Sequence, residues 1–185
     1  MTTRRAAHAL LAIALGASLA GGAACSDDAA TGGGSCQQEL GADKCFDYAC
    51  YEPGPTRSFR QDVLPIFENS CALATSCHGD PSSPDSSSGY RPYLGEPDQE
   101  TTPSDVPKIL SLLVGQDSRA ATMKIVEAGK PESSFLMHKM DGDLECASLS
   151  CTGSCGTPMP QTGDLLPREQ RDVVRDWIKQ GAQDN

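Results

Sequence analysis

The segment that decides the fold runs from Phe59 to Gly79 and reads FRQDVLPIFENSCALATSCHG. Apolar side chains recur in its first half at the spacing of one helical face (i, i+4, i+7 and i+8), and they are Phe59, Val63, Ile66 and Phe67. This spacing predicts a helix from about Ser58 to Ser70. Pro65 removes one backbone donor inside that range, so the helix either kinks there or becomes regular only near Leu64.

Cysteine and histidine follow this helix directly. Cys77 and His78 are adjacent, and five residues separate Cys77 from Cys71. Covalent haem attachment uses these residue types, because thiols add to the haem vinyl groups and the neighbouring imidazole reaches the iron from the same side. Cys71 and Cys77 can equally form a disulfide that closes a small loop after the helix. Both interpretations stay open at this point.

The N-terminus has the features of an export signal. Arg4 and Arg5 precede an apolar run, Ala9 to Ala20, that is too short to span a bilayer. The stretch Gly22-Ala23-Ala24-Cys25 resembles a relaxed lipobox, with glycine where a bulky aliphatic residue is usual. We therefore expect residues 1–24 to be a signal peptide and Cys25 to be lipidated. Cleavage after Ala20 or Ala24 by the ordinary signal peptidase is the alternative.

A glycine-rich tether over residues 25–35 follows, as a membrane-anchored domain needs. We expect an exported protein, in the periplasm or at the cell surface, that meets the membrane only through a lipid anchor. The formal net charge is −10, and loss of the leader removes two arginines and no acidic residue, which leaves −12. Nucleic acids and anionic lipid surfaces both require a positive protein surface, so the charge argues against either as a partner.

Nine cysteines in an exported chain favour disulfide bonds. If Cys25 carries lipid, an even number remains whether or not Cys71 and Cys77 hold haem, so the count does not discriminate. The pairing cannot be deduced from spacing. The disulfide candidates are Cys36, Cys45, Cys50, Cys146, Cys151 and Cys155.

The rest of the chain reads as helices separated by long loops. Residues 36–57 form a cysteine-rich lead-in, and residues 80–104 form a Pro- and Ser-rich loop that Tyr90, Tyr93 and Leu94 attach to the domain. No segment shows the apolar alternation of a strand, so the predicted fold class is all-α. We expect further helices at residues 107–114, 134–140 and 167–180, a short extended piece at 123–126 and a second cysteine-rich loop at 144–163.

Three segments of the chain, taken in order, carry a resemblance to a known family. They are Phe59 to Gly79; Gly129-x-Pro131-x-x-Ser134-x-Leu136-x-x-Lys139-Met140-x-Gly142; and Cys155-Gly156-Thr157-Pro158-Met159-Pro160 followed by Trp177-Ile178-x-x-Gly181-Ala182. Together they resemble the class I cytochrome c family, particularly the haem domains of bacterial exported proteins, over most of residues 58–185, with the loop at 80–104 as an insertion. The family spaces its cysteines Cys-x-x-Cys-His, and this chain departs from that spacing.

The resemblance implies a small cytochrome c-like domain over residues 58–185 that binds one haem c covalently through Cys71 and Cys77. His78 would be the proximal ligand, with its other ring nitrogen held by a backbone carbonyl, and Met159 the distal ligand. Because both axial positions are then filled, the implied function is electron transfer to a redox partner protein, not enzymatic catalysis. The haem would be buried among Phe67, Leu136, Val174 and Trp177.

The alternative is a haem-free, disulfide-stapled relative of this fold that acts as a binding or scaffold module. In that case a Cys71–Cys77 disulfide replaces the cofactor, and Met159 fills a gap in the core. Met137 and Met140 are expected to be packing residues and are minor candidates for the sixth ligand. His138 is expected to lie at the surface or to be a core histidine with its partners satisfied.

Overall fold

The structure is a computed structural model that describes residues 39–82, 91–161 and 163–185. The expected signal peptide (residues 1–24), Cys25, the tether (residues 25–35) and Cys36 lie outside these residues. The regular structure of the described part is helical, and extended segments meet only in isolated β-bridges such as Lys124 with Ser134. The helices are η1 (Tyr48–Cys50), η2 (Phe59–Val63), α1 (Leu64–Ser70), η3 (Pro97–Gln99), α2 (Val106–Leu113), η4 (Pro131–Ser133), α3 (Phe135–Asp141) and α4 (Arg168–Lys179).

The first long helical segment has two parts. Ser58 caps it, since its hydroxyl accepts from the Gln61 N–H at 3.2 Å while its own N–H donates to Asp62 at 2.7 Å. A π-helical turn, η2, then leads directly into α1. Pro65 lies in the first turn of α1, where an α-helix does not use the missing N–H. Regular α-helix therefore begins at Leu64, the second of the two outcomes that the proline allowed.

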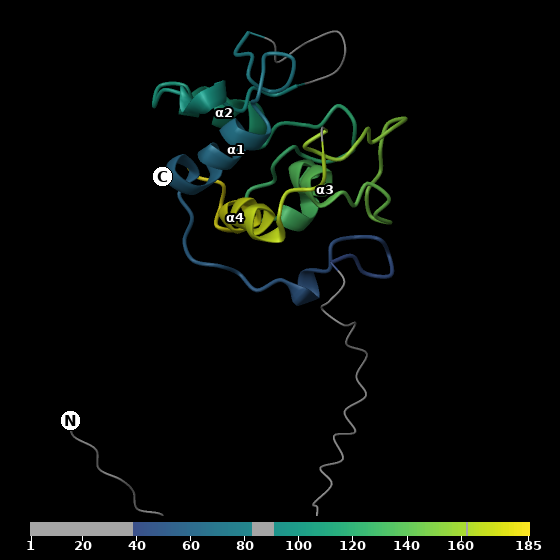
Figure 1. The fold of residues 1–185 in the computed structure, drawn as a ribbon. Coiled ribbons are helices and arrows are strands. Elements are labelled where there is room, and N and C mark those ends of the chain that lie inside the picture. Colours follow the sequence, from purple (N-terminus) through teal and green to yellow (C-terminus); the bar gives the residue numbers. More distant parts are fainter. Residues whose placement is uncertain (1–38, 83–90, 162) are drawn as a thin grey trace, which may run out of the picture. The chain divides into compact units, whose positions relative to one another are not determined.

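The core lies between this segment and α4. Phe59 and Phe67 are fully buried, and the Phe59 ring lies 5.1 Å from that of Trp177 on α4, measured between centroids. Helix α3 also packs against α4 (Figure 1). The C-terminus returns to the start of the segment, where the Asn185 side chain accepts from the Phe59 N–H at 2.9 Å. The apolar stripe read from the sequence is thus the stripe that faces the core.

A buried ion cluster joins α3 to α4. Asp141, at the end of α3, accepts from Arg171 at 2.5 Å and from Arg175 at 2.6 Å, and all three side chains are at most 3% exposed. The Arg175 guanidinium also lies 3.7 Å from the centroid of the Phe46 ring in the lead-in. Arg175 is a fully buried residue, because α4 turns it towards α3.

Disulfide bonds tie the cysteine-rich segments together. Cys45 pairs with Cys146, which links the lead-in to the second cysteine-rich loop, and Cys151 pairs with Cys155 inside that loop. Cys50 is also disulfide-bonded. Cys71 and Cys77 are free thiols. The Cys71–Cys77 disulfide that the haem-free alternative required is therefore not formed.

The loop at 80–104 is attached to the core by two of the residues singled out for this. Tyr93 and Leu94 are buried, and the Leu94 N–H donates to the His78 carbonyl at 2.9 Å. Tyr90 lies outside the described residues. None of the helices in the described part of the chain is long and apolar enough to cross a membrane.

Candidate functional site

A cavity of about 520 Å³ lies beside the segment that contains Cys71 and His78. Its volume is in the range of roughly 300–1,000 Å³ typical of small-molecule and cofactor sites. Met159, which the sequence places more than eighty residues from His78, lines the same cavity. The apolar part of its wall comes from α2, α3 and the segments before them, and consists of Leu94, Leu113, Ile125, Phe135 and Leu136.

A compact turn brings His78 back to Cys71. The His78 N–H donates to the Cys71 carbonyl at 3.2 Å, and the Cys77 and Gly79 N–H groups both donate to the Ala74 carbonyl. A Cβ on Gly79 would lie 2.8 Å from the Ala72 carbonyl oxygen, so only glycine fits this close approach. The residues that widen the cysteine spacing thus fold into a loop outside the cavity. Cys71 lines the cavity, whereas Cys77 is not among its lining residues.

The His78 ring is oriented by a backbone carbonyl. Its Nδ1 lies 2.8 Å from the Pro92 oxygen. Because a carbonyl only accepts, Nδ1 carries the proton and the lone pair of the neutral ring is on Nε2. Burial lowers the pKa of His78 and outweighs the opposite effect of the Pro92 hydrogen bond. The ring is therefore held in the neutral tautomer that can ligate a metal.

Burial also keeps Cys71 protonated. It raises the pKa of the Cys71 thiol to about 12, with a smaller contribution from nearby Cys77. At neutral pH the thiol is therefore neither a nucleophilic thiolate nor a ready partner for disulfide exchange. The group remains available as a reduced thiol facing the cavity.

Helix α3 positions the loop that carries Met159. The Met159 N–H donates to the Lys139 carbonyl at 2.8 Å, and the Lys139 Nζ donates to the Cys155 carbonyl at 2.8 Å and to Thr157. Partial burial lowers the pKa of Lys139. Lys139 of α3 thus holds both ends of the segment 155–159, Cys155 through its Nζ and Met159 through its carbonyl.

The polar wall of the cavity is cationic. Arg91, Arg119 and Lys139 line it, and none of the described lining residues is Asp or Glu. The Arg91 guanidinium donates to the Ser76 carbonyl, but its Nε is buried and has no hydrogen-bond partner among the described residues. A buried unpaired donor in such a cationic wall favours a ligand that carries an anionic group. Sequence reasoning missed these three cations, since nothing in the surrounding sequence marks them as neighbours.

Several residues expected at the site lie elsewhere. Of the four that were to surround the cofactor, only Leu136 lines the cavity, while Phe67, Val174 and Trp177 are buried in the core. Met137 and Met140 are also core residues and do not line the cavity. The reason is that the apolar face of α4 packs on η2 and α3, which leaves the cavity wall to α2, α3 and the loops.

Comparisons of this chain with protein-family models, with curated proteins and with solved structures found no match.

Proposed function

We propose that this protein is an exported, mono-haem electron carrier with a cytochrome c-like domain, anchored by lipid at Cys25. The observation that carries the proposal is that Cys71, His78 and Met159 line one cavity. These residues lie in two of the sequence segments that resemble the cytochrome c family. A thiol, an imidazole and a thioether are the donor set of a covalently attached haem with one nitrogen and one sulfur ligand.

The residues fit haem c in three respects. The Pro92 carbonyl leaves His78 Nε2 as the ligating atom. Cys71 is a free thiol, the form that adds to a vinyl group. Haem also carries two propionates, and the described lining of the cavity includes arginine and lysine side chains and no carboxylate. Cys77 would make the second link from the turn beside the cavity, as the position of His78 next to it implies.

The residues of this chain would bind the haem and control its surroundings. His78 and Met159 would supply the axial ligands, and the apolar wall would exclude water and so limit reorganisation when charge changes. A thioether ligand favours the reduced metal and raises the potential. Bound haem would supply reversible one-electron chemistry. With both axial positions taken by protein, the proposal includes a redox partner protein and no substrate.

The test is an absorption spectrum and an intact mass of protein exported from cells that carry the c-type cytochrome maturation machinery. We expect a Soret band, sharp α and β bands on reduction, and one added haem mass that survives denaturation. Cys71→Ser should leave at most a single thioether, which the pyridine haemochrome spectrum detects. A colourless protein of the apo mass would overturn the proposal and favour the haem-free binding module.

Two methionine variants test the distal ligand. Met159→Ala should open the sixth position, so that added imidazole or carbon monoxide binds and shifts the Soret band. Met140→Ala is the matched control, because Met140 is buried in the core and does not line the cavity. If the two variants bind added ligands equally, Met159 is not the distal ligand.

A further inference from the structure

A second cavity, of about 530 Å³, shares no lining residue with the first. It lies between the cysteine-rich lead-in and the end of α3, and its wall includes Cys45, His138, Asp143 and Cys146. The proposed electron-transfer function uses none of these residues.

His138 has one ring nitrogen engaged and one without a partner. Its Nδ1 lies 2.7 Å from an oxygen of Asp143, whose other oxygen accepts from the Phe46 N–H at 2.9 Å. The histidine is 5% exposed, and its Nε2 is buried with no hydrogen-bond partner among the described residues. His138 is therefore a core histidine, one of the two expected outcomes, but only one of its two ring nitrogens is satisfied. A buried ring nitrogen that has no hydrogen-bond partner and lies in the wall of a cavity can serve as a metal ligand.

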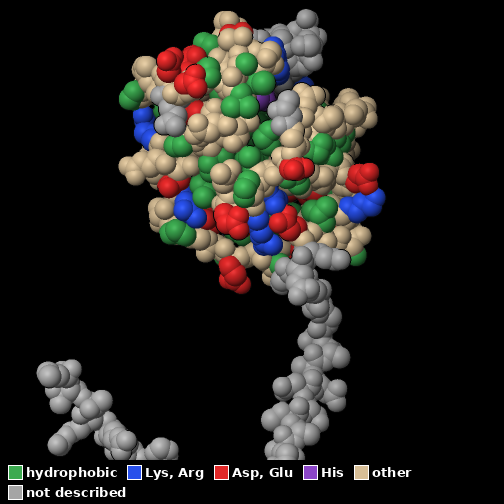
Figure 2. Space-filling view, viewed as in Figure 1, with side chains coloured by type: hydrophobic (Ala, Val, Ile, Leu, Met, Phe, Trp, Pro, Cys, Tyr) green, Lys and Arg blue, Asp and Glu red, His purple; other side chains and the backbone are tan. Residues whose placement is uncertain are grey.

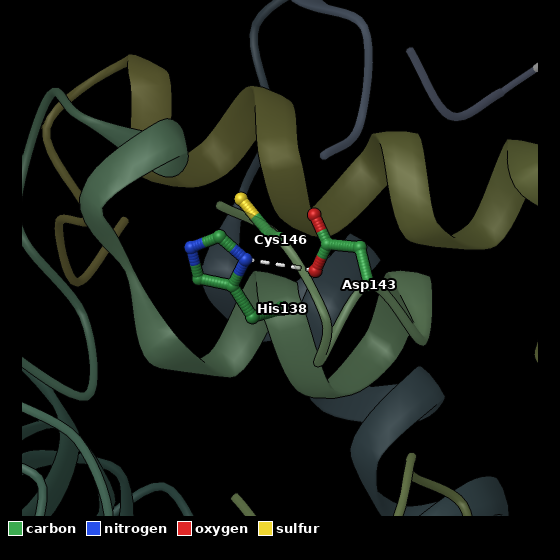
Figure 3. Close-up of side chains that lie close together, drawn as sticks. All are labelled: His138, Asp143 and Cys146. Carbon is green, nitrogen blue, oxygen red and sulfur yellow. Dashed lines mark hydrogen bonds and ion pairs between the residues drawn. The ribbon is translucent and has the colours of Figure 1, made fainter. Parts of the chain in front are cut away.

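The Cys146 sulfur lies close to the His138 ring. One nitrogen of His138, one oxygen of Asp143 and the Cys146 sulfur all lie within 4.8 Å of one another. Figure 3 shows the Cys146 sulfur and the Asp143 carboxylate both beside the imidazole ring. Cys146 is bonded to Cys45, so reduction of this single disulfide would place two thiols at the same site.

We propose that Cys45, Cys146 and His138 form a redox-gated zinc site. Two thiolates and one imidazole are a preferred donor set for Zn²⁺, with a fourth position left for water. Asp143 would act as the outer partner that fixes the His138 tautomer, the arrangement found for most metal-bound histidines. Glu132 and Asp47 also line the cavity and add negative charge around it.

The site becomes able to bind zinc when the Cys45–Cys146 disulfide is reduced. An external dithiol gives two electrons and two protons to the Cys45–Cys146 bond and itself becomes a disulfide. Zn²⁺ then displaces the two protons from the new thiols. In the oxidised protein the sulfurs have no thiolate form, so the site is closed to zinc.

The experiment is alkylation with N-ethylmaleimide, mapped by peptide mass spectrometry, on the full chain with its disulfides intact and after anaerobic reduction. We expect equimolar Zn²⁺ to protect Cys45 and Cys146 in the reduced protein, and Co²⁺ in its place to give sulfur-to-metal charge-transfer bands. The oxidised protein should show neither effect. Asp143→Asn, which keeps an acceptor for the histidine, should weaken zinc affinity about 10–100-fold.

Two variants separate this site from the other thiols. Cys151→Ser/Cys155→Ser removes the neighbouring disulfide and should leave zinc affinity unchanged, whereas His138→Gln should weaken it by more than Asp143→Asn does. Circular dichroism reports whether the reduced chain stays folded. Recovery of lost structure on zinc addition supports the site. Unfolding that zinc does not reverse overturns the proposal, as does equal protection of all cysteines or an unchanged affinity in His138→Gln.

Discussion

The residue on which the proposed function depends most is His78. Its ring is fixed by one backbone hydrogen bond to Pro92, and Pro92 is in turn held by the burial of Tyr93 and Leu94. The nitrogen that the proposal assigns to the iron is thus determined by a loop that the sequence alone presented as an insertion.

The lowered pKa of His78 predicts an acid sensitivity of the haem-free protein. Its pKa in the folded state lies below the unfolded value of 6.5, because burial disfavours the charged ring. The stability due to the neutral ring is present above pH 6.5 and is lost as pH falls through the folded pKa. Urea unfolding of the apo protein at pH 7.5 and pH 5 should show a smaller loss of stability in His78→Gln than in wild type. Equal losses would mean that His78 does not couple to folding.

Gly79 is a second residue at which a single substitution should lower the stability of the protein. An alanine Cβ there would lie 2.8 Å from the Ala72 oxygen and 3.0 Å from the Ala74 oxygen, both in the backbone. Gly79→Ala should cost about 1–3 kcal/mol of unfolding free energy, as other overpacked sites do, and should reduce haem incorporation. Ser76→Ala, at an exposed position in the same turn, should change stability by less than about 0.5 kcal/mol. Chemical denaturation of both variants measures the difference.

Among the elements, the contact of α3 with α4 combines two kinds of interaction. Apolar residues of both helices are buried together, and the ion cluster around Asp141 closes one end. Arg171 extends the cluster to Glu39 in the lead-in at 2.5 Å. The same contact between α3 and α4 positions Lys139, which in turn holds the loop that carries Met159. A rigid α3–α4 contact therefore helps to keep Met159 in the wall of the cavity.

Removing the negative charge of Asp141 from this cluster should lower the free energy of unfolding. Asp141→Asn keeps the size of the side chain but leaves Arg171 and Arg175 without their shared buried anion, which in comparable cases costs about 3–5 kcal/mol. Asp117→Asn is the matched control, since Asp117 pairs with Lys124 at 2.6 Å but is 84% exposed, and exposed pairs contribute roughly 0–1 kcal/mol. Thermal and urea unfolding of the two variants should differ clearly. A loss in Asp141→Asn no larger than that in the control would show that the cluster is dispensable.

Over the whole molecule, charge is unevenly distributed between surface and cavity. The chain carries a net −10, and Figure 2 shows acidic and basic side chains interspersed over the face around α4. Apart from cysteine and histidine, the ionisable side chains that line the cavity of Cys71 and His78 are all cationic among the described residues. The cavity therefore favours an anionic ligand electrostatically, whereas the acidic surface would repel it.

The two described disulfides should differ in their contribution to global stability. Cys45–Cys146 joins residues 101 positions apart, while Cys151–Cys155 spans 4. In the chain-entropy model a loop of about 100 residues is worth roughly 4.7 kcal/mol and one of about five residues roughly 2 kcal/mol. Cys45→Ala/Cys146→Ala should therefore lower the unfolding free energy about twice as much as Cys151→Ala/Cys155→Ala. Denaturation of the two double variants tests the ranking, and a reversed order would contradict it.

Local pattern was enough to locate the helices. The period of Phe59, Val63 and Phe67 marks a buried face, and Pro65 marks where α-helix begins, because both depend on backbone geometry within one or two turns. The helices expected at 134–140 and 167–180 agree with α3 and α4 for the same reason. The sequence likewise named Cys71, His78 and Met159 before any geometry was known.

Contacts between distant segments were decided only by the tertiary structure. Sequence could not pair Cys45 with Cys146, turn Arg175 into the core, or place Arg91 and Lys139 around the cavity beside His78. It also left open whether Cys71 and Cys77 are bonded to each other; the structure has both as free thiols. The sequence by itself thus determined the candidate residues of the proposed site, through residue type, local spacing and the family resemblance. The folded chain decided which of them share a cavity, because that depends on how helices far apart in sequence pack.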